Sequence, residues 1–284
     1  MLDESIHFEQ LPELRNPLFI AGFDGWGNAL DISKGTVAYL IRKLEAKPVA
    51  QLNPDFFYHF DENRPLVDIR DGILTALSPP GGAFYATQGT SGPRDLLLFQ
   101  GAEPGLSWHY FAERLLYLCR RLGVKTLISL GGMYDNVLHT DFAVSVSASD
   151  NKLLDEFKEK GALAVSYSGP SAIHSTIMME AQKRGFSSIS LWGHCPHYLQ
   201  GASHYGLIAH LCSLLASWGG FDVDTTELSD SWQNLSEQIQ TAIDKNPELQ
   251  EMIATLRKTK IRGVWSETGS HEKIIHLKDF LRPK

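Results

Sequence analysis

Four apolar runs in the sequence are each followed at once by a polar stretch whose side chains could bind or activate a ligand. Carboxylates and imidazoles that converge on one substrate position can act as general acid and base. In an open parallel sheet, such loops meet at the carboxyl ends of the strands. The stretches are residues 24–28 with Asp24, Trp26 and Asn28, residues 100–104 with Glu103, residues 131–136 with Asp135, and residues 193–198 with His194, His197 and Tyr198.

Each stretch also has a purely structural interpretation. Glycine and polar residues form the turn between a strand and a helix in any βα unit. Asp24 or Asn28 can cap the helix that follows, and Glu103 can favour a helix N-terminus. Both interpretations stay open at this point.

Histidine and cysteine positions offer weaker signals. His194 and His197 could bind a metal with help from His139 or His174, but an isolated His-x-x-His is weak, so we predict no metal and no cofactor. Cys195 is interpreted as a small buried group and not as a nucleophile. The phosphate loop, the Gly-x-Gly-x-x-Gly turn, the Gly-x-Ser-x-Gly elbow and the His-Glu-x-x-His helix are all missing from the sequence.

The elements that position these stretches alternate between strands and helices along the chain. This order predicts an α/β fold with a mixed, largely parallel sheet between helices. Paired β-rich pieces around Gly72, at residues 67–77, predict a hairpin. The expected strands are residues 18–23, 49–52, 96–99, 126–130, 142–146, 163–167 and 188–192, and the expected helices are residues 29–46, 107–123, 151–160, 171–184 and 206–218.

The pattern changes after Phe221. Trp232, Leu235, Ile239 and Ile243 share one helical face, and a second helix begins at residue 247. We therefore expect an α/β core domain over residues 1–224, followed by a helical appendage, a hairpin with a C-terminal tail, over residues 225–284.

Composition narrows the classes of function. The chain has 284 residues, 43% of them apolar, and its 26 Lys plus Arg against 33 Asp plus Glu give a net charge of −7. Such a chain folds into a globular core, and its acidity disfavours nucleic acid and membranes as partners. The first residues lack the order of a secretory signal, and the three cysteines suggest no disulfide framework, so we expect a cytoplasmic protein.

Taken together, five stretches resemble, in order and spacing, the landmarks of the proteasome assembly chaperone 2 family. The resemblance covers about residues 17–220. The stretches are residues 25–29, residues 95–104 followed by Trp108 and Phe111, residues 135–140 with His139, residues 167–173 with Gly169 and Pro170, and residues 191–198 with His197 and Tyr198.

The resemblance implies a phosphorylase/hydrolase-like fold, homo-oligomers that include trimers, protein partners and no established reaction. The first hypothesis is therefore a non-catalytic, assembly-chaperone-like protein. The alternative is a small-molecule-binding enzyme, hydrolase or phosphorylase-like, with a polar site at the strand ends. The candidate ligand or interface residues are Asp24, Trp26, Asn28, Glu103, Trp108, Asp135, His139, Gly169, Pro170, His197 and Tyr198.

Two departures from the family pattern affect these expectations. Relatives use a C-terminal hydrophobic-Tyr-x tail to enter pockets of the proteasome α ring, whereas this sequence ends with Pro283 in the place of the tyrosine. Relatives carry a basic residue where this chain has Asp141. We therefore expect neither the tail contact nor an anion pocket at residues 138–142.

Overall fold

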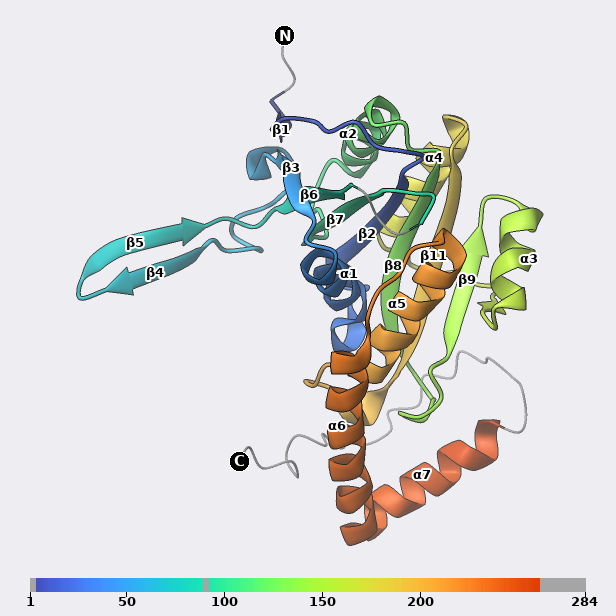
Figure 1. The fold of residues 1–284 in the computed structure, drawn as a ribbon. Helices are drawn as coiled ribbons and strands as arrows, with labels where there is room; N and C mark the ends of the chain where they lie inside the picture. The colour runs from blue at the N-terminus through green and yellow to red at the C-terminus, as the bar shows by residue number, and fades with distance from the viewer. Residues whose placement is uncertain (1–3, 89–91, 261–284) are drawn as a thin grey trace.

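The computed structural model describes residues 4–88 and 92–260, with side chains up to residue 257. A mixed nine-stranded sheet forms the centre of the molecule, and its middle strands β7, β2, β8 and β11 are parallel (Figure 1). The order across the sheet is β1 (Ile6–Phe8), β3 (Lys47–Leu52), β6 (Gly82–Thr87), β7 (Leu96–Ala102), β2 (Leu18–Asp24), β8 (Thr126–Asp135), β11 (Ser187–Pro196), β9 (Val144–Ala148) and β10 (Leu163–Ala164).

Helices cover both faces of this sheet because its central strands are apolar on both sides. Along β2, Leu18 and Ile20 belong to one buried cluster, while Phe19 and Phe23 belong to the other. Helices α2 (Trp108–Arg121) and α4 (Ile173–Lys183) contribute to the second cluster. Helices α1 (Ile32–Lys43), α3 (Asn151–Glu159) and α5 (Tyr205–Gly219) contribute to the first. The predicted α/β class is therefore confirmed.

Some predicted elements differ in extent from the observed ones. Strand β6 was not expected, because Gly82 and the prolines before it indicate a break in the chain. In fact Gly82 is needed within the strand: a Cβ there would lie 2.5 Å from a ring atom of Phe99. The expected strand at residues 163–167 shrinks to Leu163–Ala164, and Ser107 precedes α2 without making a side-chain cap.

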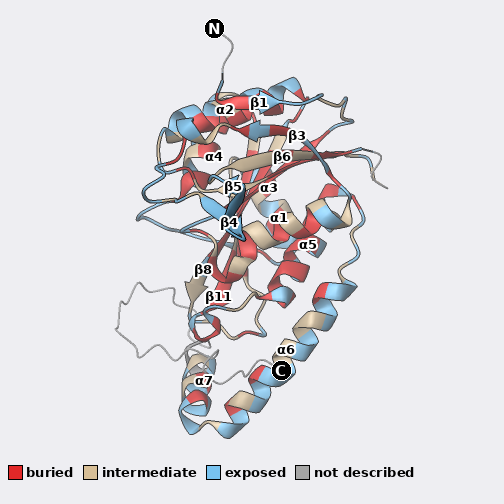
Figure 2. Cartoon of the chain, turned by 90° about the vertical axis from the view of Figure 1, so that its left-hand side faces the viewer, coloured by how far each residue is buried: buried red, intermediate tan, exposed pale blue. Residues whose placement is uncertain are grey.

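A β-hairpin stands away from the body of the molecule. Strands β4 (Leu66–Arg70) and β5 (Ile73–Ser78) form a separate two-stranded sheet, as the sequence predicted. We call residues 66–78 the arm. Figure 1 shows it projecting to the left, and Figure 2, which looks along it, shows both strands in the colour of exposed residues. The arm therefore adds nothing to the buried core.

A second hairpin, of helices, completes the described chain. Helices α6 (Thr226–Lys245) and α7 (Pro247–Lys260) bury Ile239, Ile243 and Leu249 in the same cluster as α1 and α5. The predicted helical hairpin is therefore present, while the predicted C-terminal tail with Pro283 lies outside the described residues. The boundary between residues 224 and 225 remains a proposal.

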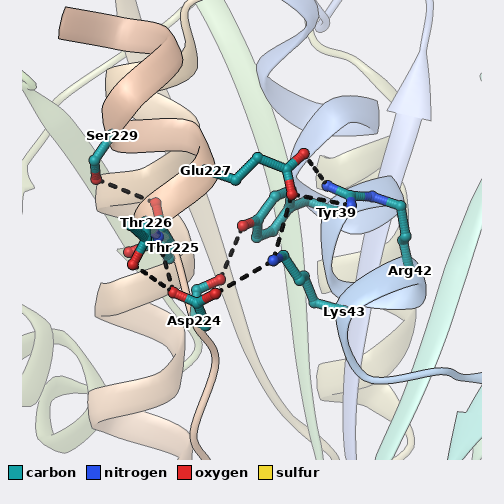
Figure 3. Close-up of polar contacts among 8 residues, drawn as sticks. All are labelled: Tyr39, Arg42, Lys43, Asp224, Thr225, Thr226, Glu227 and Ser229. Atoms are coloured by element: carbon teal, nitrogen blue, oxygen red, sulfur yellow. Dashed lines mark hydrogen bonds and ion pairs between the residues drawn. The ribbon is translucent and has the colours of Figure 1, made fainter.

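Charged and polar contacts hold the start of α6 against α1 (Figure 3). The two terminal guanidinium nitrogens of Arg42 donate to the Glu227 carboxylate, at 2.7 and 3.1 Å. Lys43 Nζ lies 3.3 Å from a carboxylate oxygen of Asp224 and of Glu227, and Tyr39 donates to the Asp224 carbonyl at 2.8 Å. We call these contacts the clamp. Hydrogen bonds from Thr226 and then from Lys43 lower the pKa of Asp224, and those from Arg42 and Lys43 lower the pKa of Glu227.

No helix within residues 4–88 and 92–260 combines the length and the apolar character needed to cross a bilayer.

Candidate functional site

The polar stretches predicted from the sequence lie at the carboxyl edge of the parallel centre, at the ends of β2, β7, β8 and β11. The strands run further than expected, so residues 131–135 and 193–196 belong to β8 and β11 and not to the loops after them. The strands do not end level with one another. Gly22 of β2 is in register with Leu130, whereas β8 and β11 continue together as far as Asp135 and Pro196. The stretches therefore share one edge of the sheet but lie at different heights along it.

Asp24 and Asn28 form a small network at the start of α1. Asn28 Nδ2 donates to Asp24 at 3.1 Å, and Lys34 Nζ forms an ion pair with Asp24 at 2.8 Å. Asn28 Oδ1 also accepts the backbone N–H of Lys34 at 3.1 Å. Partial burial raises the pKa of Asp24, but the bonds from Lys34 and Asn28 outweigh it and hold the pKa below its usual value. Asn28 thus satisfies the helix start, as its structural interpretation predicted.

Glu103 caps helix α4, which the sequence analysis did not relate to it. Its Oε1 accepts the backbone N–H of Ile173 at 2.8 Å, at the first residue of α4. The residue before the helix is Ala172, which has no side-chain acceptor, so Glu103 supplies the cap from 70 residues away. Gly25 permits this approach: it has φ +139°, and a Cβ there would lie 3.0 Å from Glu103 Cβ.

Two aromatic residues of the candidate set lie near this edge in different roles. Trp108 donates from Nε1 to the carbonyl of Pro104 at 2.6 Å and packs against the second apolar cluster. Trp26 is 66% exposed and meets the ring of Trp192 edge-on, with centroids 6.4 Å apart. Trp108 is therefore part of the scaffold, whereas Trp26 presents a large apolar surface to solvent.

Asp135 pairs with a histidine on the neighbouring strand. Its Oδ2 lies 2.8 Å from Nδ1 of His194, a side chain that is buried. His197 lies outside this pair and stacks on Tyr134, with ring centroids 5.3 Å apart. The carboxylate thus fixes the orientation of a buried imidazole, which is a structural arrangement as well as a familiar acid–base one.

His139 and Tyr198 form a buried pair beneath α6. The Tyr198 hydroxyl accepts the backbone N–H of His139 at 2.7 Å and lies 2.8 Å from its Nδ1. Burial lowers the pKa of His139 to about 4, so its ring is neutral at pH 7. His204 lies nearby: its ring stacks on Trp232, with centroids 4.2 Å apart, and its Nδ1 accepts the backbone N–H of Leu207.

A cavity of about 220 Å³ opens between the loop that carries His139 and helices α6 and α7. Apolar side chains form part of its wall, and charged and amide groups form the rest. The lining residues are Leu138, His139, Thr140, Gln240, Ile243, Asp244, Gln250, Ile253, Ala254 and Arg257.

Gly169 and Pro170 lie apart from these groups, in an exposed loop before α4. The Tyr167 hydroxyl donates to the carbonyl of Pro170 at 2.8 Å, and a Cβ on Gly169 would lie 2.6 Å from that hydroxyl. The loop is thus closed on itself by Tyr167, which is 62% exposed.

The sequence analysis considered His174 only as a possible metal ligand and left it out of the candidate set, although it packs against two strands of this edge. It is buried, and its Nε2 lies 2.7 Å from the Leu130 carbonyl. Its ring is 4.8 Å from that of Trp192, between centroids. A signal for this packing exists in Gly131, since a Cβ there would come within 2.4 Å of Trp192. Burial lowers the pKa of His174 to about 4.

Cysteine and metal chemistry find little support within the described residues. Cys195 is buried, and burial raises the pKa of its thiol, which keeps it protonated. Within residues 4–88 and 92–260, no three His, Cys, Asp or Glu side chains are grouped so that they could hold a metal ion.

The chain is an α/β protein of the layered kind. Its mixed sheet has a parallel centre, and helices cover both faces. The chain belongs to the PAC2 family, whose sequence profile matches residues 19–243. No curated protein matches the chain.

Solved structures of similar fold agree with this assignment. A PAC2 family protein from Streptomyces avermitilis is 27% identical, with a TM-score of 0.73 over 84% of this chain and 99% of that one. A Mycobacterium tuberculosis proteasome-assembly chaperone homologue is 24% identical, with a TM-score of 0.76 over 83% and 99%. The archaeal proteasome activator PbaB of Pyrococcus furiosus is 20% identical, with a TM-score of 0.67 over 83% and 97%. At the two lower identities, the likeness concerns the fold alone.

Proposed function

We propose that this chain is a non-catalytic, homo-oligomeric, assembly-chaperone-like protein that binds other proteins. The observation that carries the proposal is the use of the titratable groups at the strand ends. Glu103 caps α4, Asp24 pairs with Lys34, and Asp135 pairs with His194. General acid–base catalysis requires such groups to share one substrate position, and here each has a separate structural partner.

Family membership supports protein partners. Among the similar structures are a proteasome-assembly chaperone homologue and an archaeal proteasome activator, and both descriptions refer to a protein assembly. Two exposed aromatic residues, Trp26 at the carboxyl edge and Tyr167 in the loop before α4, suit such contacts because aromatic side chains are enriched at protein interfaces. We place the protein in the cytoplasm, since its three cysteines are free thiols.

Light scattering after size exclusion, combined with affinity capture from a lysate of the source organism, tests this proposal. We expect a mass that is a multiple of 31.7 kDa and a partner that is captured reproducibly. The Trp26→Ser variant tests the contact surface, because it removes an exposed aromatic side chain without touching the core, and we expect it to capture less of the partner. A strict monomer with no reproducible partner would contradict the proposal.

The cavity at His139 supports a second candidate, a small-molecule binder whose site lies between the loop after β8 and the helical hairpin and not among the carboxylates at the strand ends. Arg257 can bind an anionic group and Asp244 a cationic one, and both line the same space. Mass spectrometry of the small molecules released from purified, denatured protein tests this candidate. A compound present in stoichiometric amount, and absent from the Arg257→Ala variant, would support it. Protein that releases no compound would count against it.

A further inference from the structure

An exposed tryptophan, a second indole and a carboxylate come together at the carboxyl edge of the sheet. The turn that carries Trp26 has a glycine on each side of it. A Cβ on Gly25 would lie 3.2 Å from Oε2 of Glu103, and a Cβ on Gly27 would lie 3.0 Å from a ring atom of Trp192. This short turn therefore lies against both Glu103 and Trp192. We call Trp26, Trp192 and Glu103 the Trp–Glu site.

The start of α4 fixes two members of this site relative to each other. The backbone N–H of Ile173 donates to Oε1 of Glu103 at 2.8 Å. The next residue, His174, packs its ring on Trp192, with centroids 4.8 Å apart. Trp192 is also oriented by a bond from its Nε1 to Ser190 Oγ at 2.9 Å. Adjacent residues of one helix thus hold the carboxylate and the second indole in place.

The two indoles form a corner that is open to solvent. Their ring planes are inclined at 70°, with centroids 6.4 Å apart. Trp26 is 66% exposed, and Trp192 is half-buried. The face of an indole attracts cations more strongly than that of any other aromatic side chain. The corner therefore offers a cation an exposed aromatic face beside a carboxylate.

The carboxylate of Glu103 keeps one oxygen for a ligand. Oε1 is used by the helix cap, whereas Oε2 has no hydrogen-bond or ion-pair partner among the described residues. Lys34, the cation of the neighbouring network, is already paired with Asp24 at 2.8 Å. Within residues 4–88 and 92–260, no lysine or arginine neutralises Glu103, in a chain whose net charge is −7. A cation from outside the chain would supply the missing charge.

An anion would not suit this position, although helix N-termini commonly bind anions. The N–H of Ile173 already donates to Glu103, so the carboxylate occupies the place that an anion would take. Its negative charge would also repel a second anion. The charge at the start of α4 therefore selects for a cation.

We propose that the Trp–Glu site binds an arginine side chain of a partner protein. This inference rests on the proposed protein-binding function and names the chemistry of one contact. A guanidinium is flat, so it can stack on the Trp26 indole while its N–H groups donate to Glu103 Oε2. A quaternary ammonium has no N–H to donate, and the ammonium of lysine is a compact, strongly hydrated charge without a flat face.

A titration of the full chain with Nα-acetyl-arginine amide tests the site directly. The six tryptophans are replaced biosynthetically by fluorotryptophan, and the signal that disappears in Trp26→Ser is assigned to Trp26. Nα-acetyl-citrulline amide is the matched control, because it has the same shape without the charge. We expect the arginine probe to shift the Trp26 signal with a dissociation constant on the order of millimolar, and the citrulline probe to shift it far less.

Two variants of the site and one control locate the binding. Glu103→Gln keeps an oxygen for the Ile173 cap but removes the charge, so it should raise the dissociation constant about tenfold. Trp26→Ser should abolish the shift of the remaining tryptophan signals. Tyr117→Ser, which removes an aromatic side chain that is 44% exposed on α2, should leave binding unchanged.

The outcomes distinguish the site from the function on which it rests. No shift with the arginine probe, an equal shift with the citrulline probe, or unchanged binding by Glu103→Gln would overturn the site. Arginine binding in a protein that captures no partner would contradict the proposed function and confirm the guanidinium site. A partner captured equally by the wild-type protein and by both site variants would overturn the assignment of the arginine to that partner.

Discussion

Two hairpins extend from the core of this protein, and they differ in how far their apolar side chains are buried. The helical hairpin of α6 and α7 buries Ile239 and Leu249 in the core and is tied to α1 by Arg42 and Glu227 of the clamp. The arm leaves a comparable set of aliphatic side chains in solvent. The first projection therefore completes the fold of its own chain. The arm, in contrast, is shaped by its own turn at Asp71 and Gly72, and its aliphatic side chains stay exposed, as is expected of a surface that contacts other molecules.

Acid should affect the helical hairpin most strongly. His139 and His204, beside α6, have pKa values lowered to about 4 by burial, against about 6.5 when unfolded. Between these values the unfolded chain binds more protons, so stability is present above pH 6.5 and is lost as the pH falls toward 4. At roughly 1.4 kcal/mol per pKa unit, the two histidines together contribute several kcal/mol.

Urea unfolding at neutral pH and near pH 5, followed by tryptophan fluorescence, measures this loss. The variant with His139→Gln and His204→Gln should show a flatter dependence on pH. An equal free energy of unfolding at both pH values in the wild-type protein would be inconsistent with the buried, neutral histidines.

Truncation of one aliphatic side chain in each hairpin sharpens the comparison. Ile239 is fully buried, so Ile239→Ala should cost about 2–5 kcal/mol in free energy of unfolding. Ile69 on the arm is 60% exposed, so Ile69→Ala should change the stability of the dissociated subunit by less than about 0.5 kcal/mol. Urea unfolding at low protein concentration measures both, and similar losses would remove the distinction between the two hairpins.

Loss of the Glu103 side chain should reduce the free energy of unfolding by an intermediate amount. Glu103→Ala removes the acceptor for Ile173 N–H and should cost about 1 kcal/mol, as for other helix caps. Glu103→Gln keeps an oxygen acceptor and should retain most of this stability. Equal destabilisation by both substitutions in urea unfolding would show that Glu103 acts through its charge and not as a cap.

The clamp should contribute least. The side chains of Arg42 and Glu227 are 56% and 53% exposed, so solvent screens their attraction. A double-mutant cycle with Arg42→Ala and Glu227→Ala should give only a weak coupling, which decreases further at high salt. A strong coupling, or one insensitive to salt, would mean that charge and not burial holds the helical hairpin.

The sequence predicted the parts of the molecule that local patterns determine. Alternating apolar runs predicted the α/β class, the Gly72 turn predicted the arm, and the face shared by Ile239 and Ile243 predicted the helical appendage. Contacts between distant segments could not be read in this way. The cap from Glu103 to Ile173 requires the folded sheet, and strand β6 begins at a glycine that is explained only by the ring of Phe99.

The candidate site shows the same limit. Residue type and position after a strand placed Asp24, Glu103 and Asp135 at one edge of the sheet. Their partners Lys34, Ile173 and His194 come from three different elements, and these partners decide whether each carboxylate is available for chemistry. The sequence therefore predicted which side chains are acidic and where they lie, but it did not predict the structural role of each carboxylate.

Hydrogen–deuterium exchange of the full-length protein at low concentration tests the contrast between the two hairpins most directly. Amides of α6 should be protected, because this helix packs against the core, whereas amides of residues 66–78 should exchange faster. Equal protection of α6 and of the arm would contradict the claim that only the helical hairpin is part of the folded core.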